Sequence, residues 1–233
     1  MTDLSIKKIV LMAIAAVLIV CAAFVFVAAR KIYTPTEGIK ISRYADPKKA
    51  LLVIDVQEDY TGLNGKKSPL LKGVDSQILN INRLIDLAAA AGMEVVYIRQ
   101  IFDNNFITRL FIGRTIEGLP GTELDSRIKM ISQNDFTKKI SDAFSNPSLE
   151  EFLIKNHVNE VYLVGLDAAY CVYYTALGAK NRGYKVAIVK DAVMTRKNMN
   201  DILNQYEKDG ILTITSGELL DGFRLNGREE RLR

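Results

Sequence analysis

The stretch "EVYLVGLDAAYCVYYTALGAKNRGYKVAIVKDA" (residues 160–192) contains two short apolar runs with a helical segment between them. The runs "EVYLVG" and "KVAIVKDA" have the continuous apolar character of strands that are buried on both faces of a sheet. Residues 171–181 fit a helix, and Gly183 ends it. A strand, a helix and a second strand with short connections form a crossover that makes the two strands parallel.

The same alternation continues along most of the chain. Helices are predicted at residues 76–92, 149–156, 171–181 and 198–208, and the other strands at residues 50–57, 94–100, 135–139 and 211–215. This order predicts an α/β class, with a three-layer Rossmann-like fold and a mainly parallel six-stranded sheet. Residues 102–134 lack a regular pattern, and irregular segments of this length often line a functional site.

The N-terminus carries an uninterrupted apolar run of 21 residues (9–29), with Lys7 and Lys8 before it and Arg30 and Lys31 after it. As a helix rising ~1.5 Å per residue, this run is long enough to cross the ~30 Å hydrocarbon core of a bilayer. We therefore predict a single-pass transmembrane helix, with residues 1–31 as the anchor and its flanks. The residues "VAA" before Arg30 leave open a cleaved secretory signal.

Basic residues are more frequent after this run than before it. Under the positive-inside rule, this asymmetry favours a cytoplasmic location for the rest of the chain. Residues 32–49, which include Pro35, Gly38 and Pro47, are interpreted as a linker. Residues 50–220 are interpreted as the folded domain, and residues 221–233 as a charged C-terminal tail.

Composition excludes several classes of function. A formal net charge of +4 without a basic cluster argues against nucleic-acid binding. Two cysteines cannot form a disulfide framework, and a single histidine excludes sites with two or three histidine ligands. We expect no metal and no cofactor. Homo-oligomerisation stays open.

Three residue types that carry chemistry follow predicted strands. Asp55 ends the strand at residues 50–57, Lys138 and Lys139 end the strand at 135–139, and Cys171 begins a helix after the fourth strand. The carboxyl ends of parallel strands meet at one edge of a sheet, where ligands bind. Asp55 is either a turn cap or a general base. Cys171 is either an inert buried residue or a thiolate favoured by the helix N-terminus and a nearby lysine.

His157 is not expected to activate Cys171. It precedes the fourth strand whereas Cys171 follows it, and a strand of about five residues separates the two by ~17 Å. His157 is therefore predicted to lie in a loop at the opposite end of the sheet.

Four motifs together resemble the isochorismatase-like cysteine hydrolase superfamily, which includes nicotinamidases and N-carbamoylsarcosine amidases. "LLVIDVQEDY" is similar to the motif with the catalytic aspartate, and "TKKISDAF" is similar to the lysine motif. The spacing to the Ala-Phe pair selects Lys138, with Lys139 as the runner-up. "VGLDAAYCVYYTALGAKNRGY" is similar to the nucleophile motif, and "GLPGTELD" to the loop before the lysine strand.

The resemblance implies a catalytic triad of Asp55, Lys138 and Cys171 that cleaves a C–N bond of a small amide or ureide through a thioester. It also implies an oxyanion hole made by the backbone N–H groups of Asp167 and Cys171, and a cis peptide bond between Leu166 and Asp167. Substrate-pocket candidates are Gln57, Tyr60, Gln100, Phe106, Phe144 and Tyr170, although aromatic residues such as those among them belong more often to a core than to a ligand site.

Two departures from the family pattern matter. Asp167 and Ala168 stand where many members have small residues, so an extra carboxylate lies near the thiol in the sequence. The segment "YIRQIFDNNF" has no histidine, which argues against a nicotinamidase of the metal-binding type. The alternative is a catalytically idle binding or scaffold domain at a membrane. Nucleotide binding is disfavoured, because no glycine-rich phosphate loop follows "LLVIDVQ".

Overall fold

The computed structural model describes residues 3–63, 71 and 73–229, apart from the side chains of residues 3–7, 9, 24, 25, 28, 29 and 223–229. The strands are β1 (Lys48–Ile54), β2 (Glu94–Gln100), β3 (Asp135–Lys138), β4 (Val158–Leu166), β5 (Lys185–Met194) and β6 (Leu212–Ile214). The α-helices are α1 (Asp3–Ile32), α2 (Val74–Ala90), α3 (Phe106–Phe111), α4 (Pro147–Lys155), α5 (Cys171–Asn181), α6 (Met199–Lys208) and α7 (Ser216–Glu229). Two 3₁₀ helices are η1 (Pro120–Thr122) and η2 (Ala143–Ser145).

The strands form one six-stranded sheet in the order β3-β2-β1-β4-β5-β6, and all neighbouring pairs are parallel. The prediction of an α/β fold with a six-stranded parallel sheet is confirmed. The strand order reverses direction between β1 and β4. In open parallel sheets, the carboxyl ends of the strands at this reversal form the usual ligand site.

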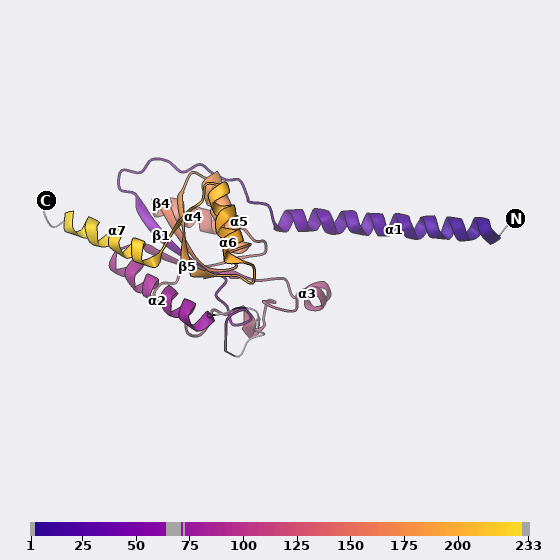
Figure 1. Cartoon of the computed structure of the whole chain (residues 1–233), viewed down its shortest axis with the longest axis horizontal. Coiled ribbons are helices and arrows are strands. Elements are labelled where there is room, and N and C mark those ends of the chain that lie inside the picture. Colours follow the sequence, from indigo (N-terminus) through magenta and orange to yellow (C-terminus); the bar gives the residue numbers. More distant parts are fainter. Residues whose placement is uncertain (1–2, 64–70, 72, 230–233) are drawn as a thin grey trace.

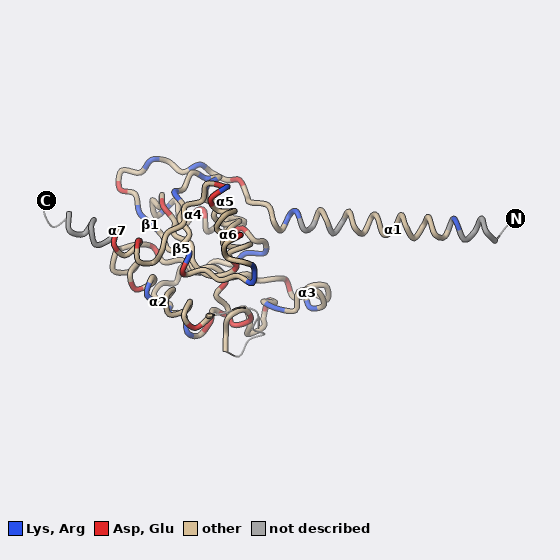
Figure 2. Tube along the Cα trace, in the orientation of Figure 1, with Lys and Arg blue, Asp and Glu red and all other residues tan. Residues whose placement is uncertain are grey.

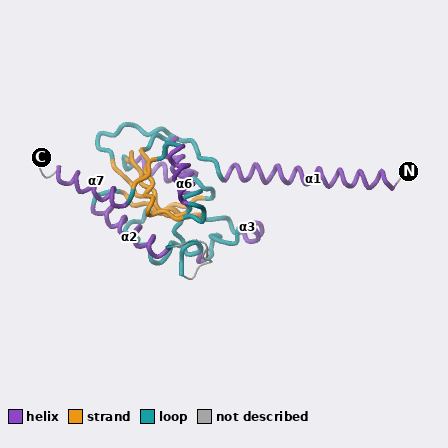
Figure 3. Tube along the Cα trace, in the orientation of Figure 1, coloured by secondary structure: helices purple, strands orange, loops and turns teal. Residues whose placement is uncertain are grey.

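Helices cover both faces of the sheet, which lies at the centre of the domain (Figures 1 and 3). Successive side chains of β1 alternate between two hydrophobic cores, as the period of two in a strand requires. Leu52 and Ile54 pack with α4, α5 and α6 on one face, and Leu51 and Val53 pack with α2 and α7 on the other. Burial on both faces explains why the strand reads as a continuous apolar run.

Helix α1 projects away from the domain, with charged residues near both of its ends (Figures 1 and 2). Within the described residues, no helix is both long and apolar enough to cross a membrane. The transmembrane segment predicted over residues 9–29 is therefore not supported by the structure.

Residues 33–44, here named the strap, do not form the free linker expected over residues 32–49. Thr36 donates from its backbone N–H and its hydroxyl to Asp142 Oδ2, each at 2.7 Å. The N–H of Ile39 donates to Glu150 Oε1 at 2.8 Å, and the Arg182 carbonyl accepts from the N–H of Ile41 at 2.9 Å. The strap is therefore part of the folded domain, held by groups that the sequence pattern does not reveal.

The C-terminal boundary also differs from the expectation. The predicted charged tail at residues 221–233 begins inside α7, which ends at Glu229. Residues 230–233 lie outside the described part. Leu219 anchors α7 in the core shared with α2.

Candidate active site

Asp55 directly follows β1 and adopts a left-handed backbone conformation, with φ of 52°. This conformation is uncommon for a residue other than glycine and is maintained only where the surroundings determine it. The N–H of Asp55 donates to the carbonyl of Ile98 at 2.8 Å, which fixes the turn. The carboxyl is 2% exposed, and it lies at the predicted sheet edge.

Gly165 in β4 allows the two central strands to approach at this point. A Cβ atom there would lie 2.1 Å from the carbonyl oxygen of Ile54, and the residue has φ of 108°. Both the contact and the conformation require glycine. The end of β4, which leads to Cys171, is therefore held against the end of β1, which carries Asp55.

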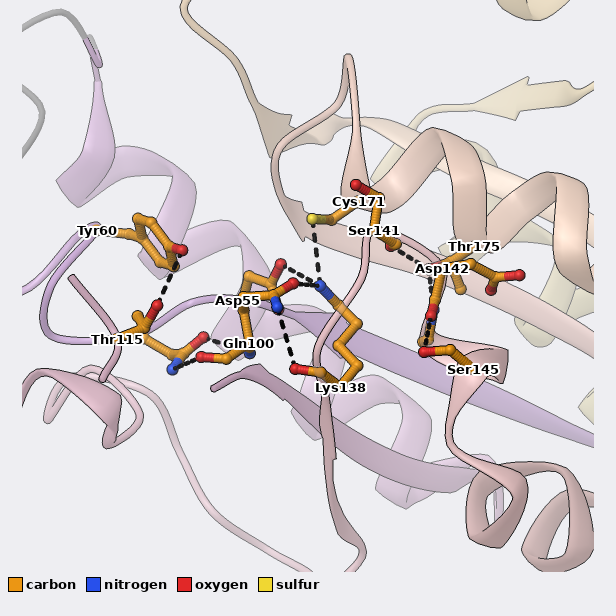
Figure 4. Close-up of polar contacts among 12 residues, drawn as sticks. Asp55, Tyr60, Gln100, Thr115, Lys138, Ser141, Asp142, Ser145, Cys171 and Thr175 are labelled. Atoms are coloured by element: carbon orange, nitrogen blue, oxygen red, sulfur yellow. Dashed lines mark hydrogen bonds and ion pairs between the residues drawn. The ribbon is translucent and has the colours of Figure 1, made fainter. Parts of the chain in front are cut away.

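Lys138 ends β3, and its side chain is fully buried against the other two residues of the predicted triad (Figure 4). Its Nζ donates to Asp55 Oδ2 at 2.8 Å, to Gln100 Oε1 at 2.6 Å and to Cys171 Sγ at 3.2 Å. The Gln100 side chain in turn donates to the Lys138 carbonyl at 3.1 Å, which holds the lysine in place. All three N–H groups of the Lys138 ammonium therefore have an acceptor inside the protein.

Lys139, the runner-up, points away from this cluster. Its Nζ forms an ion pair with Asp103, and its side chain is exposed. Side chains that alternate across a strand separate two adjacent lysines in this way.

Cys171 is the first residue of α5 and follows the turn that contains the cis peptide bond between Leu166 and Asp167. The environment of the thiol bears on the two alternatives left open for Cys171, a buried inert residue and a thiolate. Burial, and after it the charge of Asp55, raises the pKa of the Cys171 thiol to about 12, although Lys138 acts in the opposite direction. A neutral thiol beside a carboxylate and an ammonium leaves the buried cluster without net charge, which is the state that costs least in an apolar surrounding.

Lys138 remains charged in this cluster. Burial lowers its pKa, but the charge of the Asp55 carboxylate and its hydrogen bond to the lysine act in the opposite direction, and the pKa is raised overall. The Oδ2 atom of Asp55 accepts from the lysine, whereas Oδ1 is buried and has no hydrogen-bond partner among the described residues. An unpaired carboxylate oxygen next to a neutral thiol can accept the thiol proton.

A pocket of about 260 Å³ opens onto Cys171 and Asp55. Its wall is partly aromatic and carries two arginines. It is formed by Ile32, Tyr33, Asp55, Tyr60, Leu71, Gln100, Phe102, Arg114, Ser141, Leu166, Asp167, Tyr170, Cys171 and Arg196.

Three of the six predicted pocket residues line it: Tyr60, Gln100 and Tyr170. Tyr60 contacts the Thr115 hydroxyl at 3.2 Å. Burial, followed by the charge of Asp55, raises the pKa of Tyr60, so the phenol is neutral at ordinary pH.

The other three predictions are wrong. Gln57 is fully buried, and its side chain bonds the backbones of Gln100 and Thr122. Phe106 lies on α3 and is 77% exposed. Phe144 belongs to the core and packs against Tyr184. Strand-end position and aromatic character do not distinguish a wall residue from a structural one, because both depend on the partners that the fold provides.

Sequence reasoning missed the pocket residues that come from segments without a motif. Phe102 and Arg114 belong to the long irregular stretch, in which only Phe106 was named as a candidate. Arg196 follows β5, and strand-end position could have indicated it. Ile32 and Tyr33 lie at the end of α1 and the start of the strap, and no pattern placed them near the site.

The extra carboxylate of Asp167 is engaged in the turn before α5. Its Oδ1 accepts from the N–H of Ala169 at 2.8 Å, and burial raises the pKa of the carboxyl. His157 lies before β4, is exposed and stacks on Tyr44, as expected for a loop histidine remote from the thiol. Within the described part of the chain, no group of three or more His, Cys, Asp and Glu side chains could hold a metal ion.

Comparison with known proteins places this geometry in a family. Residues 49–211 match the model of the isochorismatase domain. The uncharacterized isochorismatase family protein PncA of Bacillus subtilis (strain 168) is 28% identical over 160 residues, which are 63% of this chain and 86% of that protein. The nicotinamidase of Escherichia coli (strain K12) is 26% identical over 178 residues, covering 62% and 82% of the two chains. The crystal structure of N-carbamoylsarcosine amidase from Thermoplasma acidophilum has a TM-score of 0.62 at 25% identity and covers 72% of this chain and 96% of that one. The chain belongs to the isochorismatase family.

Proposed function

We propose that this chain is a cysteine hydrolase that cleaves a C–N bond of a small amide or ureide. The observation that carries the proposal is the position of Lys138 Nζ, which contacts Asp55 at 2.8 Å and Cys171 at 3.2 Å inside a pocket. Relatives named as a nicotinamidase and an N-carbamoylsarcosine amidase support the amide class. A pocket of about 260 Å³ suits a small molecule.

The first step transfers the thiol proton of Cys171 to Asp55 as Sγ attacks the carbonyl carbon. Because burial and the charge of Asp55 raise the pKa of the Cys171 thiol, a base must take its proton during attack. The acceptor is Oδ1 of Asp55, which is buried and has no hydrogen-bond partner among the described residues. Lys138 remains protonated and stabilises whichever neighbour carries the negative charge.

The tetrahedral intermediate carries its charge on the former carbonyl oxygen. The N–H of Cys171, at the first position of α5, has no acceptor within its own helix and is free for an oxyanion, together with the N–H of Asp167. Collapse breaks the C–N bond, and the departing nitrogen takes the proton from Asp55. Water then attacks the thioester while Asp55 accepts its proton, and release of the carboxylic acid returns that proton to the thiol.

The test is release of ammonia or amine from a panel of small amides and ureides that includes nicotinamide and N-carbamoylsarcosine. Wild type is compared with Cys171→Ala, Lys138→Ala and the matched control Lys139→Ala. We expect turnover by wild type and Lys139→Ala and none by the other two, with an acyl adduct at Cys171 in intact-mass spectra. Ligand-induced stabilisation without turnover or adduct for any compound would instead indicate a binding domain.

Location at a membrane is a separate proposal. It rests on the apolar residues 9–29 and on exposed side chains of α1 such as Leu11, Leu18 and Val27. We expect the full chain to sediment with membranes and to resist carbonate extraction. The accessibility of the domain to added protease would then show on which side of the membrane it lies. Recovery in the supernatant would refute this location and leave the hydrolase proposal unaffected.

A further inference from the structure

Part of the pocket wall comes from outside the segment that matches the family. The isochorismatase domain covers residues 49–211, yet Ile32 and Tyr33 line the same pocket as Cys171. We propose that Tyr33 is a specificity-determining residue that limits the size of the group admitted beside Cys171. This role rests on the proposed function, because it assumes that Cys171 is the reacting group.

Tyr33 lies in an aromatic cluster at the pocket. Its ring centroid is 5.4 Å from that of Tyr170 and 5.9 Å from that of Tyr174, with the rings tilted. Lys197 Nζ lies 4.6 Å from the Tyr170 ring centroid. Tyr33 is 44% exposed, so one part of its ring packs against the cluster and another part faces the opening. A ring in this position restricts access without contacting the triad.

The strap fixes Tyr33 from both sides. The carbonyl of Ile32 accepts from the N–H of Ser141 at 3.1 Å, and Ser141 itself lines the pocket. Three residues after Tyr33, the backbone and hydroxyl of Thr36 are bound to the buried carboxylate of Asp142. Because both attachments are close in sequence, the tyrosine backbone has little freedom to move away. Tyr33 is therefore a rigid wall residue.

A second buried group holds the strap beyond Tyr33. Arg182 is 2% exposed, and its guanidinium donates to the carbonyls of Thr36 at 2.9 Å and Glu37 at 2.8 Å. Its other hydrogen bonds go to the Glu150 carboxylate at 2.7 Å and to the Gly178 carbonyl at 3.0 Å. A guanidinium that forms several hydrogen bonds in a fixed geometry orients the backbone well. The strap is thus built into the domain that carries the pocket.

The predicted consequence is selection by size, with no effect on the chemical step. Tyr33 makes no described contact with Asp55, Lys138 or the Cys171 sulfur, so its truncation leaves the triad geometry in place. We expect Tyr33→Ala to admit larger groups and to change KM rather than kcat for a substrate that the wild type accepts. Tyr33→Phe keeps the ring and is expected to behave as wild type.

The experiment measures the alkylation rate of Cys171 in the full-length protein by peptide-resolved mass spectrometry. Two reagents with the same reactive group, iodoacetamide and 2-iodo-N-phenylacetamide, are compared, and each rate is divided by the rate with glutathione. We expect the ratio of bulky to small reagent to rise about tenfold in Tyr33→Ala and to stay at the wild-type value in Tyr33→Phe. The ratio requires only a reachable thiol, so it remains informative if no amide is hydrolysed.

Tyr44→Ala is the matched control, because Tyr44 belongs to the same strap but stacks on His157 away from the pocket. We expect its ratio to equal that of wild type. An unchanged ratio in Tyr33→Ala would overturn the proposal. An equal rise in Tyr44→Ala would also overturn it, since the effect would then come from a loosened strap and not from the Tyr33 ring.

Discussion

Lys138 Nζ lies 3.2 Å from Cys171 Sγ, although 33 positions separate the two residues in the chain. The contact exists because β3 and β4 end at the same edge of a parallel sheet, on either side of β2 and β1. The same ammonium also binds Asp55, so one cation serves both a carboxylate and a thiol.

The negative charge of Asp55 is expected to affect the pKa of the Cys171 thiol, and alkylation can test this. The rate of Cys171 alkylation by iodoacetamide is expected to rise about tenfold per pH unit from pH 7 to 10 without a plateau, because the thiolate reacts and its pKa is about 12. Asp55→Asn removes a negative neighbour of the thiolate, so the thiol pKa falls and the curve moves to lower pH. Asp103→Asn, at an exposed carboxylate, serves as the control. A shift to higher pH in Asp55→Asn would contradict the proposed electrostatics.

The two adjacent lysines are expected to differ sharply in their effect on stability. Lys138→Met leaves the buried Asp55 carboxylate without its cation, which costs about 3–5 kcal/mol in the free energy of unfolding. Lys139→Met removes an exposed ion pair and should leave the urea midpoint unchanged. Adding Asp55→Asn to Lys138→Met should restore much of the loss. If the two single variants unfold at the same urea concentration, the ion pair with Asp55 is not buried in solution.

Gly165 is expected to tolerate no side chain. In Gly165→Ala the new Cβ meets the Ile54 carbonyl oxygen, and φ is unfavourable, so we expect a loss of about 2–4 kcal/mol. The control is Gly222→Ala in α7, where no atom lies within 4 Å of the added Cβ. That change should be neutral or slightly stabilising, as alanine favours helix. Thermal unfolding of both variants tests the close approach of β4 to β1.

Removal of the strap is expected to destabilise the domain even though the strap lies outside the matched family segment. A chain that lacks residues 1–47 loses two carbonyl acceptors of the buried Arg182 and the donors to Asp142, at a cost of about 2–4 kcal/mol. A chain that lacks only residues 1–31 keeps these contacts and should unfold at the wild-type temperature. Equal melting temperatures for the two truncations would show that the strap adds no stability.

The predicted fold and triad geometry come from local signals with a direct physical meaning. Continuous apolar runs predicted β1, β4 and β5, because a strand buried on both faces needs such a composition. Parallel strands then brought Asp55, Lys138 and Cys171 to one edge without any knowledge of distances. The choice of Lys138 over Lys139 came from the family resemblance, and the structure places Lys138 in the cluster.

The pocket was only partly predictable. Gln57 and Gln100 lie at or just beyond the ends of neighbouring strands. The side chain of Gln57 forms hydrogen bonds with the backbone of Gln100, whereas the side chain of Gln100 lines the pocket. The sequence left open whether Cys171 is a buried residue or a thiolate, because it shows a helix N-terminus and a lysine but not the burial that raises the pKa of the thiol. Burial and hydrogen-bond partners are properties of the packed chain.

The sequence by itself determined the α/β class, the parallel sheet and the edge at which a thiol, a carboxylate and a lysine meet. These depend on periodicity and strand direction, which are local. Only the tertiary structure decided which oxygen of Asp55 has no hydrogen-bond partner among the described residues, that burial raises the pKa of the thiol, and that Tyr33 from the strap lines the pocket. Those features arise from contacts between segments distant in the chain, and no local pattern encodes which buried groups will be neighbours.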